Sequence, residues 1–210
     1  MAKREKSDIL SGMGTGFQIL KRLRDGCNND RNLRRLLKDD GCFQRVVEIL
    51  NEEDGVIDVQ RSFGFPTSYD QSNGLRKLIE LAVGEQNIRN INNNITQERF
   101  PLAGTGVRKL NLRVEPYLHG ETSELAALRL MVAGHVPANT GDLAGFLREH
   151  PTEVEKWNWV SAISADSWWT DSDGYVYVPC ANVDGAYRNF YLCDLRSRLR
   201  SGCGVLVVCE

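Results

Sequence analysis

The feature that most limits how this chain can fold is a regular alternation of apolar and polar residues in segment 107–118. Leu110, Leu112 and Val114 alternate there with asparagine, arginine and glutamate. Successive side chains of a β-strand point to opposite faces, so a period of two predicts a strand with one face on a core and the other in water. A sheet is therefore expected to be part of the fold.

Helical patterns are predicted on both sides of this strand. Before it, residues 75–83 have helical spacing and end at Gly84. Residues 64–68 are expected to form a turn or loop, and the asparagine-rich residues 87–94 are expected to form a loop that caps its neighbours. After it, two helices are predicted with caps at Thr122 or Ser123 and at Thr140. Their expected apolar faces are Leu125, Leu128 and Val132 in the first, and Leu143, Phe146 and Leu147 in the second, which breaks at His150 and Pro151.

The C-terminal part of the chain has short apolar runs separated by polar loops. These runs, at residues 157–163, 175–178, 190–192 and 205–208, predict brief strands joined by long surface connections. Strands grouped beside helices indicate an α+β fold, here a domain covering residues 55–210.

Residues 1–54 are different, because their apolar residues repeat at helical spacing. They predict a small helical N-terminal unit, followed by a short β-like segment at 56–60. Arginine and lysine are frequent in this unit, but acidic residues interleave with them, which favours solvated helix surfaces over a nucleic-acid patch.

Charge and cysteine usage argue against several classes of function. The formal net charge of -2 disfavours a general nucleic-acid binder, which needs a basic excess. Residues 1–8 lack signal-peptide character and no run of about 18 apolar residues occurs, so we expect no membrane span and a chain that is cytoplasmic as synthesised. In that reducing compartment the six cysteines are expected to stay free thiols. No Cys-x-x-Cys pair is present, and neither a metal nor a cofactor is predicted.

The segment from Thr170 to Val208 has an unusual composition. It contains no Lys, Glu, Gln, Met or Trp, although all five types occur before it. These are the residue types that no codon ending in a pyrimidine can encode. The residues that fill the segment, such as Asp, Ser, Tyr, Asn and Arg, all have such codons.

The chain from about Tyr69 onward resembles the variable proteins of diversity-generating retroelements, in the form common in small-genome uncultivated bacteria. The resemblance rests on the order and spacing of several segments and not on one motif. They are residues 95–102 with Gly104 and Gly106, residues 134–138, residues 143–146 with Pro151, and residues 178–180, 191–192 and 205–208.

The resemblance implies a C-type-lectin-like fold whose exposed C-terminal residues are varied by templated mutagenesis at adenines. It implies a display protein that recognises varied macromolecular ligands, such as other proteins, without chemistry, through a variable face at residues 170–203. Tyrosines would supply rigid contact area there, and asparagines would supply hydrogen bonds that can change partner, as in antibody loops. Arginines would add planar groups of hydrogen-bond donors. The predicted ligand-binding residues are Trp169, Asp171, Asp173, Tyr175, Tyr177, Asn182, Asp184, Tyr187, Arg188, Asn189, Tyr191, Asp194, Arg196, Arg198 and Arg200.

Two groups of aromatic residues have predictable orientations. In the Tyr-Val-Tyr-Val run at 175–178 one pair must face inward, and we expect Tyr175 and Tyr177 to face solvent. The spacing of Trp157 and Trp159 places both on one side of a strand, which favours core packing over ligand contact.

Two alternative functions remain open. One is an oxidative enzyme related to formylglycine-generating proteins, which share the broad fold and use a cysteine pair, here Cys180 and Cys203. The other is a structural interaction module that docks through residues 1–54. Asp171 and Asp173 resemble part of a calcium loop, but no Glu follows at the required distance, which excludes an EF-hand.

Overall fold

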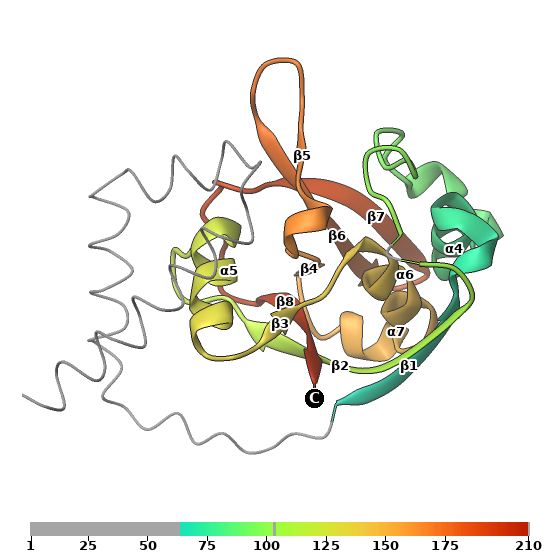
Figure 1. The fold of residues 1–210 in the computed structure, drawn as a ribbon, viewed down its shortest axis with the longest axis horizontal. Helices are drawn as coiled ribbons and strands as arrows, with labels where there is room; N and C mark the ends of the chain where they lie inside the picture. Colours follow the sequence, from blue (N-terminus) through green and yellow to red (C-terminus); the bar gives the residue numbers. More distant parts are fainter. Residues whose placement is uncertain (1–63, 103, 210) are drawn as a thin grey trace, which may run out of the picture. The chain divides into compact units, whose positions relative to one another are not determined.

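The computed structural model of this protein describes residues 64–102 and 104–209 (Figure 1). The chain divides into two units, residues 1–58 and residues 59–210, and the described residues all belong to the second. The predicted helical unit at 1–54 and the β-like segment at 56–60 lie outside the described residues. Within these residues, no helix has both the length and the apolar character needed to cross a membrane.

The described residues form one mixed sheet with the order β1-β2-β8-β4-β6-β5, in which β3 also pairs with β8 and β7 with β6. The pairings are antiparallel except for β4 with β8. The strands are β1 (Phe65–Asp70), β2 (Val107–Pro116), β3 (Val136–Pro137), β4 (Trp159–Ser161), β5 (Trp169–Thr170), β6 (Val176–Asp184), β7 (Tyr187–Asp194) and β8 (Cys203–Cys209).

Helices lie on both faces of this sheet. They are α4 (Gly74–Val83), α5 (Ser123–Val132), α6 (Thr140–Glu149) and the short α7 (Pro151–Val154), with the 3-10 helices η1 (Gln71–Asn73), η2 (Glu85–Asn90) and η3 (Ala165–Ser167). Helices and an open sheet in one domain confirm the predicted α+β class.

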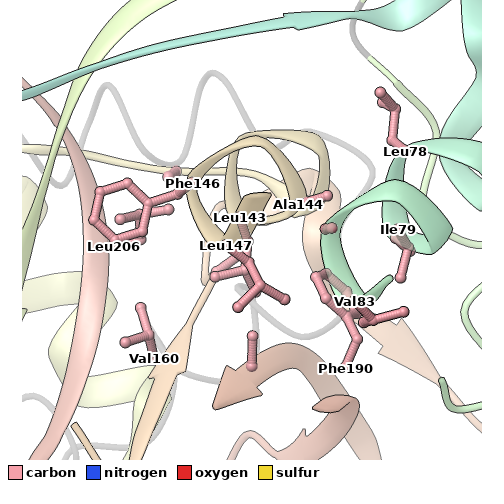
Figure 2. Close-up of a cluster of buried hydrophobic side chains, with 14 of the residues drawn as sticks. Leu78, Ile79, Val83, Leu143, Ala144, Phe146, Leu147, Val160, Phe190 and Leu206 are labelled. Atoms are coloured by element: carbon pink, nitrogen blue, oxygen red, sulfur yellow. The ribbon is translucent and has the colours of Figure 1, made fainter. Parts of the chain in front are cut away.

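Alternate residues of β8 separate two hydrophobic clusters, one on each face. Leu206 belongs to the first cluster, which is built with α4 and α6, whereas Val205 and Val207 belong to the second, which is built with α5. Figure 2 shows α4 and α6 packed side by side over Phe190 of β7. We name the two sides of the sheet the α4/α6 face and the α5 face.

Several predicted elements are present where local pattern favoured them. The alternating segment forms β2, and the helix at 75–83 is α4, which ends at Gly84 with a φ of 84° that suits glycine. The asparagine-rich segment begins inside the 3-10 helix η2 and is only partly a loop, but it does cap its neighbour, because Asn87 Nδ2 donates to the carbonyl of Val83 at 3.1 Å. Thr122 caps α5 as expected, accepting from the Leu125 amide.

Other local predictions were wrong. Residues 65–68 belong to β1 and do not form a loop, since Pro66 lies on an outer strand that needs no amide there. Helix α6 is capped by Asn139, not Thr140, through a capping box with Asp142. The long connection expected before residue 190 is a tight turn, in which Gly185 has a φ of 56° between Asp184 and Tyr187.

The packing of two further segments also differs from expectation. Helix α5 buries mainly Ala126, Ala127 and Leu130 in the second cluster, because small residues allow the helix to approach the sheet closely, and Leu125 and Val132 are only half-buried. The tryptophans before and in β4 do not share a side: Trp157 packs against the first cluster and Trp159 against the second.

Candidate functional site

Most of the predicted ligand-binding residues lie on the antiparallel hairpin of β6 and β7. The register places Asn182 opposite Asn189, Asp184 opposite Tyr187 and Cys180 opposite Tyr191. Directly opposite residues point to the same face of a sheet, and their neighbours in sequence point to the other. The predicted variable face is therefore divided between two sides of one hairpin.

One side of the hairpin continues the α5 face beyond its buried part. Val178 and Cys193, which are opposite each other, pack in or against the second cluster. Cys180 is also buried on that side, and the other side chains from Tyr191 to the turn are polar or aromatic. Trp159 of β4 lies on the same side, and its ring meets that of Tyr191 edge-on at 6.1 Å. We name this surface the hairpin strip, consisting of Trp159, Asn182, Asp184, Tyr187, Asn189 and Tyr191.

Every side chain of the hairpin strip is half-buried or exposed. Tyr187 at the turn is 54% exposed. In the middle of the strip Asn189 Nδ2 donates to Asn182 Oδ1 at 2.8 Å, which links the two strands through side chains at a partly buried position. The strip thus combines flat aromatic area with amide groups that can exchange hydrogen-bond partners.

The opposite side of the same hairpin is part of the core. Phe190 is fully buried in the first cluster (Figure 2). Arg188 Nη1 donates to the carbonyl of Ala82 at 2.9 Å, near the C-terminal end of α4. The alternation of β7 directs Arg188 toward α4, where a cation stabilises the carbonyl end of the helix. Its contact with a ligand stays a prediction, and its side chain lies on the opposite side from the hairpin strip.

The β5–β6 hairpin carries a separate group of predicted residues and projects from the body of the domain (Figure 1). Trp169 stacks on Tyr177 with ring centroids 5.8 Å apart, and the Arg99 guanidinium lies 4.5 Å from the centre of the Trp169 ring. Tyr177 is opposite Asp194, so this group lies on the α4/α6 side and not with the hairpin strip. Sequence reasoning missed Arg99, whose position far upstream gives no local signal.

The orientation predicted for the tyrosines of this hairpin is confirmed. Val176 and Val178 are buried, whereas Tyr175 is 58% exposed and Tyr177 half-exposed. Desolvation raises the pKa of the Tyr177 hydroxyl, and the carboxylates of Asp171 and Asp194 raise it further.

The acidic residues at the tip of the β5–β6 hairpin shape its turn. Asp171 Oδ1 accepts from the amides of Asp173 and Tyr175 at 3.0 and 2.9 Å. Such local bonds are typical of an aspartate that closes a turn. Across residues 64–102 and 104–209 no group of three or more His, Cys, Asp or Glu side chains could hold a metal ion.

The remaining predicted residues, Arg196, Arg198 and Arg200, are exposed on the loop between β7 and β8. This loop lies beside the hairpin strip, because Asn158, the neighbour of Trp159, donates from its side chain to the carbonyl of Ser201 at 3.2 Å. We name residues 195–202 the arginine loop; through Ser201 it contacts the segment that carries Trp159 of the hairpin strip.

The cysteines differ from expectation. Cys180 and Cys193 form a disulfide, so the prediction that all cysteines are free thiols is wrong for this pair. Cross-strand pairing makes them diagonal neighbours on one face, which brings the sulfurs within bonding reach. Cys203 is a buried free thiol whose pKa is raised by burial. The Cys180–Cys203 pair required by the oxidative-enzyme alternative is not formed.

A shallow hollow of about 360 Å³ lies elsewhere, over β1, β2 and the end of α6. Its lining is Pro66, Thr67, Ser68, Lys109, Leu110, Asn111 and Glu149. None of the predicted ligand-binding residues lines it. The side chains of the hairpin strip lie on one face of a hairpin and are half-buried or exposed, an arrangement typical of contacts with macromolecules.

Comparisons with known proteins do not assign a function to this surface. No family model, no curated protein and no solved structure matches the chain.

Proposed function

We propose that this protein is a binding module with a C-type-lectin-like domain, which recognises a protein ligand through the hairpin strip without chemistry. The observation that carries the proposal is the alternation along β7. Tyr187, Asn189 and Tyr191 are accessible on one side, while Arg188 and Phe190 hold the strand to the core on the other.

The separation of core-facing from accessible side chains along β7 supports recognition by a surface whose residues can vary. The strand is held by contacts that the strip does not make: burial of Phe190, the bond from Arg188 to Ala82, and the Cys180–Cys193 disulfide. Side chains of the strip can then be replaced while the backbone keeps its place. Tyrosine and asparagine are suited to such a surface, because they combine stiff contact area with adaptable hydrogen bonds.

We further propose that the strip is diversified by a retroelement, as the residue usage after Thr170 suggests. The encoding DNA and its flanks test this proposal. We expect a near-copy of the segment for residues 170–208, with differences at adenines of the copy that fall in the codons for Asn182, Asp184, Tyr187, Asn189 and Tyr191. The codons for Phe190 and Leu192 should be spared. Differences spread evenly over β7, or the absence of a near-copy, would contradict diversification.

A display experiment tests binding itself. A library of the full chain randomised at Asn182, Asp184, Tyr187, Asn189 and Tyr191 should yield folded binders to a panel of unrelated proteins. The matched control is a library randomised at exposed positions of α4 and η2, namely Arg76, Lys77, Leu81, Glu85 and Gln86. Equal yields from the two libraries, or loss of folding throughout the strip library, would refute the assignment of the strip as the binding surface.

A further inference from the structure

The loop between β7 and β8 displays three arginines in a fixed pattern. Leu195 is buried and Leu199 is half-buried against the second cluster, whereas Arg196, Arg198 and Arg200 are exposed. Because the leucines point to the core, their arginine neighbours are directed to solvent.

The backbone of this loop is held in place at both leucines. The amide of Leu195 donates to the carbonyl of Val176 at 2.8 Å, and the amide of Leu199 donates to the carbonyl of Glu121 at 3.0 Å. A loop whose backbone is already ordered loses little conformational entropy when a ligand binds. The guanidinium groups are therefore presented from a prearranged support.

Two carboxylates beside this loop, those of Glu121 and Asp194, already accept hydrogen bonds. Glu121 is buried and accepts from Arg129 Nε and Nη2 at 2.8 and 3.0 Å. Asp194 Oδ1 accepts from the backbone amide of Arg196 at 2.7 Å. Within the described part of the chain none of the three loop arginines forms an ion pair. Three positive charges are thus left for a partner, although the whole chain has a formal net charge of -2.

We propose that Arg196, Arg198 and Arg200 are the charged end of the binding surface and select acidic polypeptide segments. This inference rests on the proposed function, because it names the chemistry of the ligand for the same surface. A guanidinium group binds a carboxylate through two parallel hydrogen bonds, and positive charge beside an aromatic patch steers an acidic partner toward it. Trp159 and Tyr191 would receive the apolar residues that flank the carboxylates.

Acidic polypeptide fits this surface better than nucleic acid does. Exposed Asp173 and Asp184, on the two neighbouring hairpins, limit the basic area to one loop. A continuous phosphate backbone would meet these carboxylates, whereas a short acidic segment ends before it reaches them.

The test measures binding of a fluorescein-labelled Glu-Gly-Ser repeat peptide to the full chain at low salt. A Gln-Gly-Ser peptide of equal length and a single-stranded oligothymidine of equal charge serve as comparison ligands. We expect the glutamate peptide to bind best, and replacement of the three loop arginines by glutamine to slow its association about tenfold. Added salt should weaken binding to the original chain more than binding to the variant.

The matched control carries Lys77→Gln, Arg89→Gln and Arg148→Gln, which removes the same charge from exposed positions outside the loop. It should bind the glutamate peptide like the original chain, and both variants should keep the original thermal midpoint. Equal losses in the two variants would overturn the proposal in favour of a net-charge effect. Tighter binding of the oligothymidine would overturn it in favour of nucleic acid.

The two proposals can fail separately. If the strip library yields protein binders but the glutamate peptide binds no better than its glutamine analogue, the role of the arginine loop is wrong and the proposed function stands. If the peptide binds through the arginines but the strip library yields no binders, the arginine loop is a site of its own and the assignment of the strip is wrong.

Discussion

The two sides of the β6–β7 hairpin are made of residues that alternate in sequence but behave differently. On one side Phe190 and Arg188 contact α4 and the first cluster; on the other Tyr187, Asn189 and Tyr191 remain accessible. The difference teaches that one strand can serve both as scaffold and as display surface, because alternate side chains point to opposite faces and each face can have its own function. Substitutions that compare the two sides test this division.

The largest effect is expected at Phe190. Phe190→Ala removes a fully buried ring from the first cluster and should lower the free energy of unfolding by about 4 kcal/mol. Tyr191→Ala, one position along on the other side, should cost about 1 kcal/mol through its contact with Trp159. Urea unfolding followed by circular dichroism measures both. Comparable losses would mean that both sides of the hairpin are core.

The disulfide should have the next largest effect, and it lies in the buried part of the face that carries the hairpin strip. Replacing Cys180 and Cys193 by alanine removes a link across 13 residues of sequence and should lower the free energy of unfolding by about 3 kcal/mol. Dithiothreitol should destabilise the original chain similarly and leave the double variant unchanged. A variant that still responds to the reductant would show that the effect lies outside this pair.

A smaller effect is expected at Arg188. Arg188→Ala removes a charged donor from the carbonyl of Ala82 and should lower the free energy of unfolding by about 1.5 kcal/mol. Arg198→Ala, at an exposed arginine of the neighbouring loop, serves as the control and should change it by less than about 0.5 kcal/mol. Urea unfolding compares the two variants. Equal losses of unfolding free energy for Arg198→Ala and Arg188→Ala would remove the distinction between anchoring and displayed arginines.

The smallest effect should occur at the turn of the hairpin. Tyr187→Ser alters a side chain that is 54% exposed and should change the free energy of unfolding by less than about 0.5 kcal/mol. Thermal melts at equal protein concentration are sufficient to detect it. A loss above about 1.5 kcal/mol would place Tyr187 in the structural half of the hairpin and weaken the case for a display surface.

The elements that sequence predicted well are those whose signals are local. Strand β2 was recognisable because its alternation needs only its own residues, and α4 because Gly84 ends it with a left-handed conformation. Strand β1 was mistaken for a loop, because glycine and proline, here Gly64 and Pro66, are typical of turns. Proline is compatible with a strand when the strand lies at the edge of a sheet, and only the tertiary structure shows that β1 does. The buried face of α5 was predicted only in part: Leu128 is buried as expected, but Leu125 and Val132 are half-buried, because the partner surface is made by distant strands.

The candidate site was predicted as a set of residues but not as an arrangement. Composition after Thr170 identified aromatic and polar residues that the structure does place at accessible positions, including Tyr175 and Tyr187. It did not foresee that Arg188 bonds to α4 on the other side of β7, and it missed Arg99, which reaches Trp169 from a segment far upstream. The disulfide was missed because a reducing compartment was expected, whereas strand pairing places Cys180 and Cys193 side by side.

The sequence by itself determined the α+β class, the alternation of strands and helices, and the residue types available at the C-terminal surface, because periodicity and composition are local properties. Only the tertiary structure decided which of those residues meet. The register between β6 and β7 directs Asn182, Asn189 and Tyr191 to one face and Arg188 to the other. A shift of one residue in that register would exchange the two faces, and register depends on contacts across the whole sheet.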